Sequence, residues 1–408
     1  MSSIHRSKSI DKSLFSQILA IIPTTIFNQC VSKAGTDEKS RCYSTHHQFV
    51  SMLFGQLNDC CSLRDITLGL NVNTLFLKEL GLGQSPARST MSDGNAERDA
   101  EVFLLLFYEL VRYYKASFAK SEHYKVIEGI NGQSVKIVDA TTIGVCLNLI
   151  NWAKFRTAKG GIKAHVGFDL AAQIPEMVYV TDANAPERHY LPHIDPDYKH
   201  IVVFDRGYLD FNYFKDRIDH HAPFVTRLKS NIRYEVLEER PIAVGCPHIL
   251  KDEIIKIHGV HAKTTGLERY LLRQVTVFDE KNKREIKLLT ANMDWTAETV
   301  SQLYRSRWQI ELFFKAIKQK LHIKTFLGTS ENACKSQIYI AMIAFLLIEI
   351  IRKCISKTKH SFSNFVNLIR ICLLHYHSLQ YVVNDIKQIS IKLKDRDGPK
   401  YSSPTLFE

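Results

Sequence analysis

Several kinds of site are missing from this chain of 408 residues. It has nine cysteines, but no two of them form a C-x-x-C pair, so the sequence contains no cysteine pattern typical of zinc. The odd number of cysteines also argues against a disulfide framework, and we expect a reducing, cytoplasmic compartment. No Ser-His-Asp or Cys-His pattern indicates catalysis by a nucleophilic side chain.

Long apolar runs are scarce as well. The longest covers residues 338–351, contains Glu349, and is shorter than the roughly 20 residues that a membrane-spanning helix needs. The first fifteen residues lack the basic and then apolar order of a signal peptide. We therefore expect no membrane partner, and a buried helix at 338–351.

Positive charge, in contrast, is abundant and concentrated. The formal net charge is +12, and residues 301–360 contain 11 Lys and Arg against three Glu and no Asp, a local net charge of +8. A basic segment of this kind favours an acidic partner, and nucleic acid is the first candidate.

The basic segment begins with a helical pattern over residues 301–323. At ~100° per residue, Tyr304, Arg307, Glu311 and Lys318 fall on one polar stripe beside an apolar stripe. A carboxylate in a row of basic groups suits a cation held next to a phosphate backbone. The alternative is a solvated face with ion pairs at helical spacing.

The order of segments predicts an α/β fold class preceded by helices. We expect an N-terminal helical domain over residues 1–125, with helices at 13–33 (interrupted at Pro23), 45–58 and 88–118. This domain is a candidate for DNA binding, and packing or dimerisation is the alternative. The remaining predicted segments are a sheet domain over 130–225 and 293–355, a β-rich insertion over 226–292, and a C-terminal helix with a polar tail over 356–408.

Two aspartates follow apolar, strand-like runs within the sheet domain. Asp139 follows Val135–Val138, and Asp205 follows Ile201–Phe204. Together with Glu311 they would suit hard divalent cations, which prefer oxygen ligands, and two such ions assist in-line phosphoryl displacement. Asp139 would then bridge both ions. An Asp at the end of a strand is more often a turn residue, and we make that assignment for Asp169 and Asp182.

The motifs together resemble a known family. The spacing Tyr304-x₂-Arg307-x₃-Glu311-x₆-Lys318 resembles the Y-R-E-K signature of bacterial DDE transposases of the insertion-sequence-four family. IVDATTI around Asp139 and VVFDRGY around Asp205 resemble its two Asp motifs, in the correct order. The resemblance covers residues 130–330 well and the flanks loosely.

This resemblance implies a ribonuclease H-like fold, in which a mixed sheet with helices holds the three carboxylates. It implies a DNA transposase that cleaves at terminal inverted repeats and joins the freed 3′-hydroxyl to target DNA, with Mg²⁺ as cofactor and Mn²⁺ as a substitute. Asp139, Asp205 and Glu311 would be catalytic metal ligands. Tyr304, Arg307 and Lys318 would contact DNA, with Arg206 as a weaker candidate. The implied partners are double-stranded DNA and a second copy of the chain, at the bacterial nucleoid.

Two other functions stay open at this point. A nuclease of the same fold would cut DNA without joining it, and only the reaction products would distinguish it. A DNA-binding protein of the same fold with little or no activity is the other alternative. The presence of all three carboxylates counts against the latter.

Overall fold

The chain folds into two compact units. The computed structural model describes residues 11–38, 40, 42–72, 74–120, 128–145, 154–155, 159–321, 323, 326–356 and 360–384. Within these, one unit comprises residues in the ranges 1–123, 143–162 and 314–398, and the other those in 124–142 and 163–313. The predicted polar tail from residue 392 lies outside the described residues.

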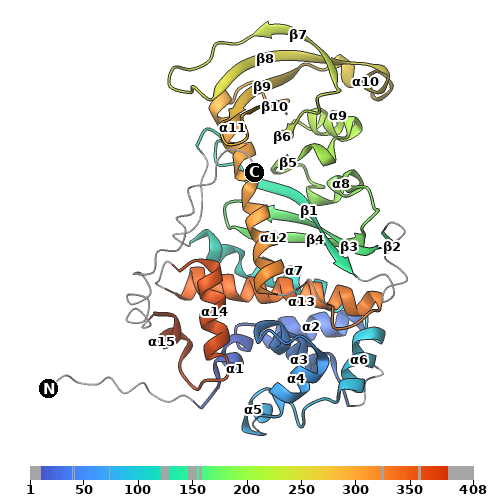
Figure 1. Cartoon of the computed structure of the whole chain (residues 1–408), viewed down its shortest axis with the longest axis vertical. Helices are drawn as coiled ribbons and strands as arrows, with labels where there is room; N and C mark the ends of the chain where they lie inside the picture. Colours follow the sequence, from blue (N-terminus) through green and yellow to red (C-terminus); the bar gives the residue numbers. More distant parts are fainter. Residues whose placement is uncertain are drawn as a thin grey trace, which may run out of the picture. The chain divides into compact units, whose positions relative to one another are not determined.

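The first unit is built mainly of helices (Figure 1). These are α1 (Leu14–Leu19), α2 (Thr24–Ala34), α3 (Thr45–Leu57), α4 (Leu63–Leu70), α5 (Thr74–Glu79), α6 (Arg88–Glu97), α7 (Glu101–Ala119), α13 (Glu331–Ile350), the π-helix η5 (Ile351–Ile355), α14 (Phe362–Cys372) and α15 (Leu379–Asn384).

Local signals fix most of these helix boundaries. Pro23 separates α1 from α2 as predicted, and the Ser62 side chain accepts a hydrogen bond from the backbone of Asp65 at the start of α4. The single helix predicted over 88–118 is wrong. The chain breaks after α6 because Arg98 adopts an extended conformation, in which its guanidinium binds Gln48 Oε1 (2.7 Å) and the carbonyl oxygen of Tyr43.

The apolar run at 338–351 lies almost entirely in α13, where its side chains are buried. α13 packs against α3, α6 and α7 (Figure 1). The sequence predicts this segment as part of the sheet domain, whereas in the structure it packs among the helices of the first unit. No helix in the described part of the chain has both the length and the apolar character needed to cross a membrane.

The strands, in chain order, are β1 (Val135–Val145), β2 (Lys154–Phe155), β3 (Lys159–Asp169), β4 (Ile174–Asp182), β5 (Ile201–Phe204), β6 (Phe224–Arg227), β7 (Arg233–Glu239), β8 (Ile249–His258), β9 (Leu272–Asp279) and β10 (Arg284–Thr290). The helices between and after them are η2 (Glu187–Tyr190), α8 (Leu191–Ile194), η3 (Arg206–Tyr208), α9 (Phe211–Asp219), α10 (Val260–Thr265), η4 (Leu267–Arg269), α11 (Ala297–Ser306) and α12 (Trp308–Lys320).

The centre of the sheet has the strand order β4-β3-β1-β5-β6. β5 runs parallel to both β1 and β6. The N–H of Leu170, just after β3, donates to the carbonyl of Val135 at the start of β1 (3.0 Å), so β3 and β1 run in opposite directions. This mixed five-stranded core, flanked by helices, is the ribonuclease H-like fold that the family resemblance implied.

The β-rich insertion continues the same sheet. β10 pairs antiparallel with β6, and β9, β8 and β7 follow outward in that order. The buried Arg273 on β9 binds both carboxylate oxygens of Asp252 on β8 (2.8 and 2.6 Å) and the carbonyl of Trp295 (2.5 Å). The insertion is thereby joined to the segment that leads into α11.

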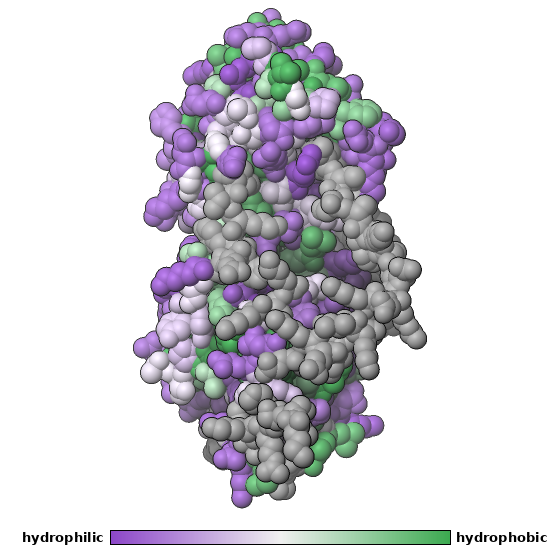
Figure 2. Space-filling model, turned by 90° about the vertical axis from the view of Figure 1, so that its left-hand side faces the viewer, coloured by the Kyte–Doolittle hydropathy of each residue, from purple (hydrophilic) through white to green (hydrophobic). Residues whose placement is uncertain are grey.

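Both faces of the parallel part of the sheet are covered. All four residues of β5 are buried, as expected for a strand in a sheet with elements on both sides. α11 packs on β5, β6 and β10. A cluster of buried hydrophobic side chains contains Phe204, Tyr208, Phe214 and Phe224. On the molecular face drawn in Figure 2, the coloured surface is mostly hydrophilic with small hydrophobic groups, as is typical of globular proteins.

A buried histidine between β3 and β4 gives a testable pH dependence of stability. His165 is 1% exposed, stacks on Tyr190 and contacts Thr181 Oγ1 (3.1 Å), and burial lowers its pKa to about 4. Unfolding then takes up a proton between pH 6.5 and 4, so stability falls as the pH falls through this window. We expect His165→Gln to remove up to about 3 kcal/mol of this loss, measured by denaturant unfolding at pH 7 and pH 4.5. If the wild type and His165→Gln lose the same stability between pH 7 and pH 4.5, this prediction is wrong.

Candidate active site

The two aspartates predicted from sequence lie side by side because of strand register. β1 and β5 are parallel, and their last aligned pair is Val138 with Phe204. Asp139 and Asp205 each come one residue later, where the parallel pairing of the two strands ends. Asp205 directly follows β5 as predicted, whereas Asp139 lies within β1, which continues to Val145. Carboxyl ends of adjacent parallel strands are where open α/β sheets place their sites.

The third carboxylate comes from the second of two helices that are separated by the single residue Arg307, which itself keeps right-handed helical dihedrals (φ −53°, ψ −30°). The continuous helix predicted over 301–323 is wrong, since α11 ends at Ser306 and α12 starts at Trp308. Around Arg307 the backbone bonds span three residues, from the N–H of Arg307 to Tyr304 and from the N–H of Ile310 to Arg307, both at 3.1 Å. Thr296 caps α11, and its side chain accepts a hydrogen bond from the N–H of Thr299 (3.0 Å).

Side chains from this turn bind all three carboxylates. The hydroxyl of Tyr304 donates to Asp205 Oδ1 (2.9 Å). Arg307 donates to Asp139 Oδ2 through Nη1 (3.1 Å) and to Glu311 Oε1 through Nη2. The structure therefore brings together five of the predicted site residues, which we call the carboxylate cluster: Asp139, Asp205, Tyr304, Arg307 and Glu311.

The electrostatics of the carboxylate cluster are strongly coupled. Burial raises the pKa of Asp139 to about 7, with Glu311 and Asp205 adding to the rise, while Arg307 and the N–H of Ala140 (2.8 Å) oppose it. Burial and the neighbouring Asp205 also raise the pKa of Tyr304, so this phenol remains protonated. Burial opposes the charge on Arg307, but Tyr304 and the three carboxylates raise its pKa.

Sequence comparison decides the family. The family described as "Transposase DDE domain" matches residues 130–347, just over half of the chain and all of the carboxylate cluster. The chain belongs to this transposase family. A second family, described as a domain of unknown function (DUF4372), matches residues 11–83 in the helical unit.

Relatives of this transposase-family chain include proteins named as transposases. One is y4zB of Sinorhizobium fredii, 29% identical over 292 residues, which cover 71% of this chain and 78% of the relative. Another is named for insertion sequence element IS5377 of Geobacillus stearothermophilus, 26% identical over 58% of this chain and 61% of the relative. A piggyBac transposase in a synaptic complex with hairpin DNA gives a TM-score of 0.42 at 12% identity, over 95% of this chain and 82% of that one.

The donor chemistry of the transposase domain fits a hard divalent cation. The three carboxylates of the cluster offer the oxygen ligands that Mg²⁺ prefers. As they stand, no three His, Cys, Asp or Glu side chains among the described residues are arranged to hold a metal ion. In the cluster, Arg307 bonds oxygens of Asp139 and Glu311, and Tyr304 bonds one oxygen of Asp205.

The sequence analysis missed one basic residue near the cluster. Arg227 ends β6, the third parallel strand, and interacts electrostatically with Tyr304 and Asp205. Burial lowers its pKa, and in the described part of the chain its guanidinium has no hydrogen bond or ion pair. The signal was available, because Arg227 follows an apolar strand as Asp205 does. Of the two other predicted DNA contacts, Arg206 is exposed after Asp205, and Lys318 lies on α12 seven residues after Glu311.

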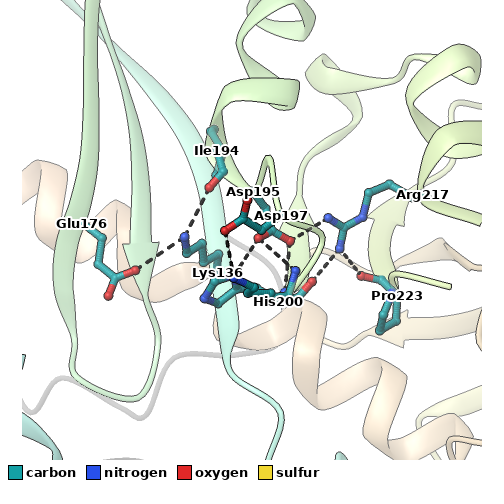
Figure 3. Close-up of polar contacts among 9 residues, drawn as sticks. Lys136, Glu176, Ile194, Asp195, Asp197, His200, Arg217 and Pro223 are labelled. Carbon is teal, nitrogen blue, oxygen red and sulfur yellow. Dashed lines mark hydrogen bonds and ion pairs between the residues drawn. The ribbon is translucent and has the colours of Figure 1, made fainter. Parts of the chain in front are cut away.

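A buried polar network holds the opposite ends of the same strands (Figure 3). Arg217 on α9 is fully buried and donates to Asp195 Oδ2 (2.7 Å) and to the carbonyls of His200 (2.5 Å) and Pro223 (3.0 Å). His200 and Pro223 immediately precede β5 and β6, so Arg217 joins the beginnings of these strands. Burial would raise the pKa of Asp195, but the bonds from His200 and Arg217 hold it well below its usual range.

β1 is fixed in the same region. The ammonium group of Lys136 contacts Glu176 Oε2 on β4 (3.7 Å) and donates to the carbonyl of Ile194 (3.2 Å), and Figure 3 shows it beside the Asp195 network. Lys136 lies three residues before Asp139. The network therefore fixes the beginnings of the strands that position the two aspartates.

Proposed function

We propose that this chain is a DNA transposase that cleaves at the terminal inverted repeats of an insertion sequence and joins the freed ends to target DNA. Cleavage would use water to break the phosphodiester bond and leave a 3′-hydroxyl. Joining would transfer that 3′-oxygen to a target phosphorus and release a target 3′-oxygen. The supporting observation is the carboxylate cluster, in a chain that belongs to the transposase DDE family.

In this proposal Asp139, Asp205 and Glu311 hold Mg²⁺ or Mn²⁺, and Asp139 is shared between two ions. Bound cations would supply charge stabilisation for the attacking and leaving oxygens. Tyr304, Arg307 and Lys318 bind phosphates of the DNA end, and Arg206 is a further candidate. The net charge of +8 over residues 301–360 supports this arrangement by favouring the polyanion.

We also propose that two copies act together and bridge two DNA ends. The helical region at 1–125 is the proposed reader of the terminal repeat. The catalytic domain would comprise 130–225 and 293–355, with the insertion at 226–292; the last part of the range 293–355, in α13, packs among the helices of the first unit. Support for these roles comes from the family of residues 130–347 and from the separate helical unit.

The test is cleavage of a labelled duplex that carries the terminal repeat of the flanking element. We expect Mg²⁺-dependent nicking at the repeat end by the wild type and none by Asp205→Ala, with DNA binding retained by both. Nicks without joined products would favour a nuclease. Binding without cutting by the wild type would favour a DNA-binding protein of the same fold with little or no activity.

A further inference from the structure

The proposed function gives Arg307 two different sets of binding partners, carboxylates and a DNA phosphate. Its guanidinium bonds Asp139 and Glu311, the two carboxylates proposed to hold cations, yet the Y-R-E-K resemblance assigns it to a DNA phosphate. The side chains of Arg307, Asp139 and Glu311 retain only 13%, 20% and 29% of their exposure. The ion pairs of Arg307 with Asp139 and Glu311 are therefore largely shielded from water, and their electrostatic attraction is strong.

The bonding capacity of the guanidinium makes the two roles compete. A guanidinium has five N–H donors in a rigid plane, and its terminal nitrogens are the ones that grip a carboxylate or a phosphate in a two-point contact. In Arg307 both terminal nitrogens bond carboxylates, and the buried Nε has no partner among the described residues. A two-point grip on phosphate requires Arg307 to give up at least one carboxylate.

Cation binding explains why Arg307 would lose its bond to a carboxylate. A divalent cation and a guanidinium compete for the same carboxylate oxygens, and the cation carries the larger charge at a shorter range. Tyr304 differs, since it is neutral and its bond to Asp205 leaves the charge of that carboxylate uncompensated. Arg227 differs too, because it interacts with the cluster without bonding to a carboxylate.

We propose that Arg307 is an exchangeable counterion: a cation displaces its guanidinium from Asp139 and Glu311, and the freed guanidinium binds a phosphate of the DNA end. This exchange rests on the proposed function and couples the two ligands. Each ligand then favours the other, by the same factor in both directions. Until both arrive, the guanidinium of Arg307 stays bonded to Asp139 and Glu311, which delays cation loading until a DNA end is present.

The test measures Mn²⁺ affinity without DNA, from free Mn²⁺ by electron paramagnetic resonance. Arg307→Gln removes the competitor, so we expect it to bind Mn²⁺ about tenfold or more tightly than the wild type. Arg227→Gln removes a nearby positive charge that bonds no carboxylate, and is the matched control. We expect a much smaller gain there. Arg307→Lys retains a charge without the two-point fork, and we expect an intermediate affinity.

A second arm adds a pre-cleaved repeat duplex with a 3′-deoxy terminus, which cannot be joined. We expect the duplex to raise the Mn²⁺ affinity of the wild type about 5- to 150-fold, the range of coupled sites, and to leave that of Arg307→Gln nearly unchanged. Circular dichroism verifies that each variant is folded. If Arg307→Gln does not fold, Arg307→Lys carries the comparison.

The outcomes separate this proposal from the proposed function. An Mn²⁺ affinity in Arg307→Gln equal to or below that of the wild type overturns the exchange, as do equal gains in Arg307→Gln and Arg227→Gln. In either case the proposed function stands if the wild type still cuts DNA. If Asp139→Asn binds Mn²⁺ as well as the wild type does, the carboxylates are not the cation site, and both proposals fall.

Discussion

Asp139→Asn is expected to abolish cleavage of terminal-repeat DNA, with a loss of about a thousandfold or more. The substitution keeps the size of the side chain and removes one charged oxygen from the proposed cation site, and cation stabilisation of the transition state is worth several kcal/mol. The measurement is the single-turnover cleavage rate in Mg²⁺. Asp182→Asn, at the end of β4, is the matched control and should cut like the wild type.

Stability distinguishes lost chemistry from lost folding in this variant. The pKa of Asp139 is raised to about 7, so its contribution to stability is present at acid pH and is lost as the pH rises through 7. At pH 8 the ionised carboxylate is a net cost to the folded state. We therefore expect Asp139→Asn to be at least as stable as the wild type at pH 8. An inactive but destabilised variant would contradict this account.

Arg217→Met is expected to destabilise the protein by about 3–5 kcal/mol, because it leaves Asp195 buried without its charged partner. The carbonyls of His200 and Pro223 also lose a donor, which loosens the beginnings of β5 and β6. Denaturant unfolding at neutral pH measures the change.

The control for Arg217→Met is an exposed ion pair that lies two to four residues after Asp195, the partner of Arg217. Lys199 contacts Asp197 at 2.9 Å, but the two side chains are 70% and 66% exposed. We expect Lys199→Met to change stability by less than about 1 kcal/mol. Similar losses in both variants would mean that the buried network contributes no more than a surface pair does.

Much of the fold was predictable because local signals and the tertiary structure agree. The apolar runs at Val135–Val138 and Ile201–Phe204 form the first part of β1 and all of β5, and their parallel pairing brings the two following aspartates together. Thr296, Ser62 and Pro23 mark helix starts through their own side chains. These features need only neighbours in the sequence.

The errors arose where distant partners decide the backbone. The apolar spacing runs unbroken through both Arg98 and Arg307, so it predicts continuous helices. In each case the helix is interrupted at an arginine that binds groups far away in sequence: the extended Arg98 binds Gln48 and Tyr43, and Arg307, which stays helical in its dihedrals, binds Asp139. The placement of α13 was missed for a similar reason, since its neighbours α3 and α7 lie more than 200 residues earlier.

The insertion also determines where the sheet stops. A sheet that ended at β6 would present the unpaired backbone of an almost fully buried strand, which invites another chain to add a strand. Instead the last strand is β7, whose sequence RYEVLEE is mostly exposed and carries three glutamates and a bulge between Val236 and Glu238. Like-charged, irregular edges resist intermolecular pairing. Because of the insertion, the edge strand of the sheet is β7 and not β6, and β7 disfavours aggregation through strand pairing with other chains.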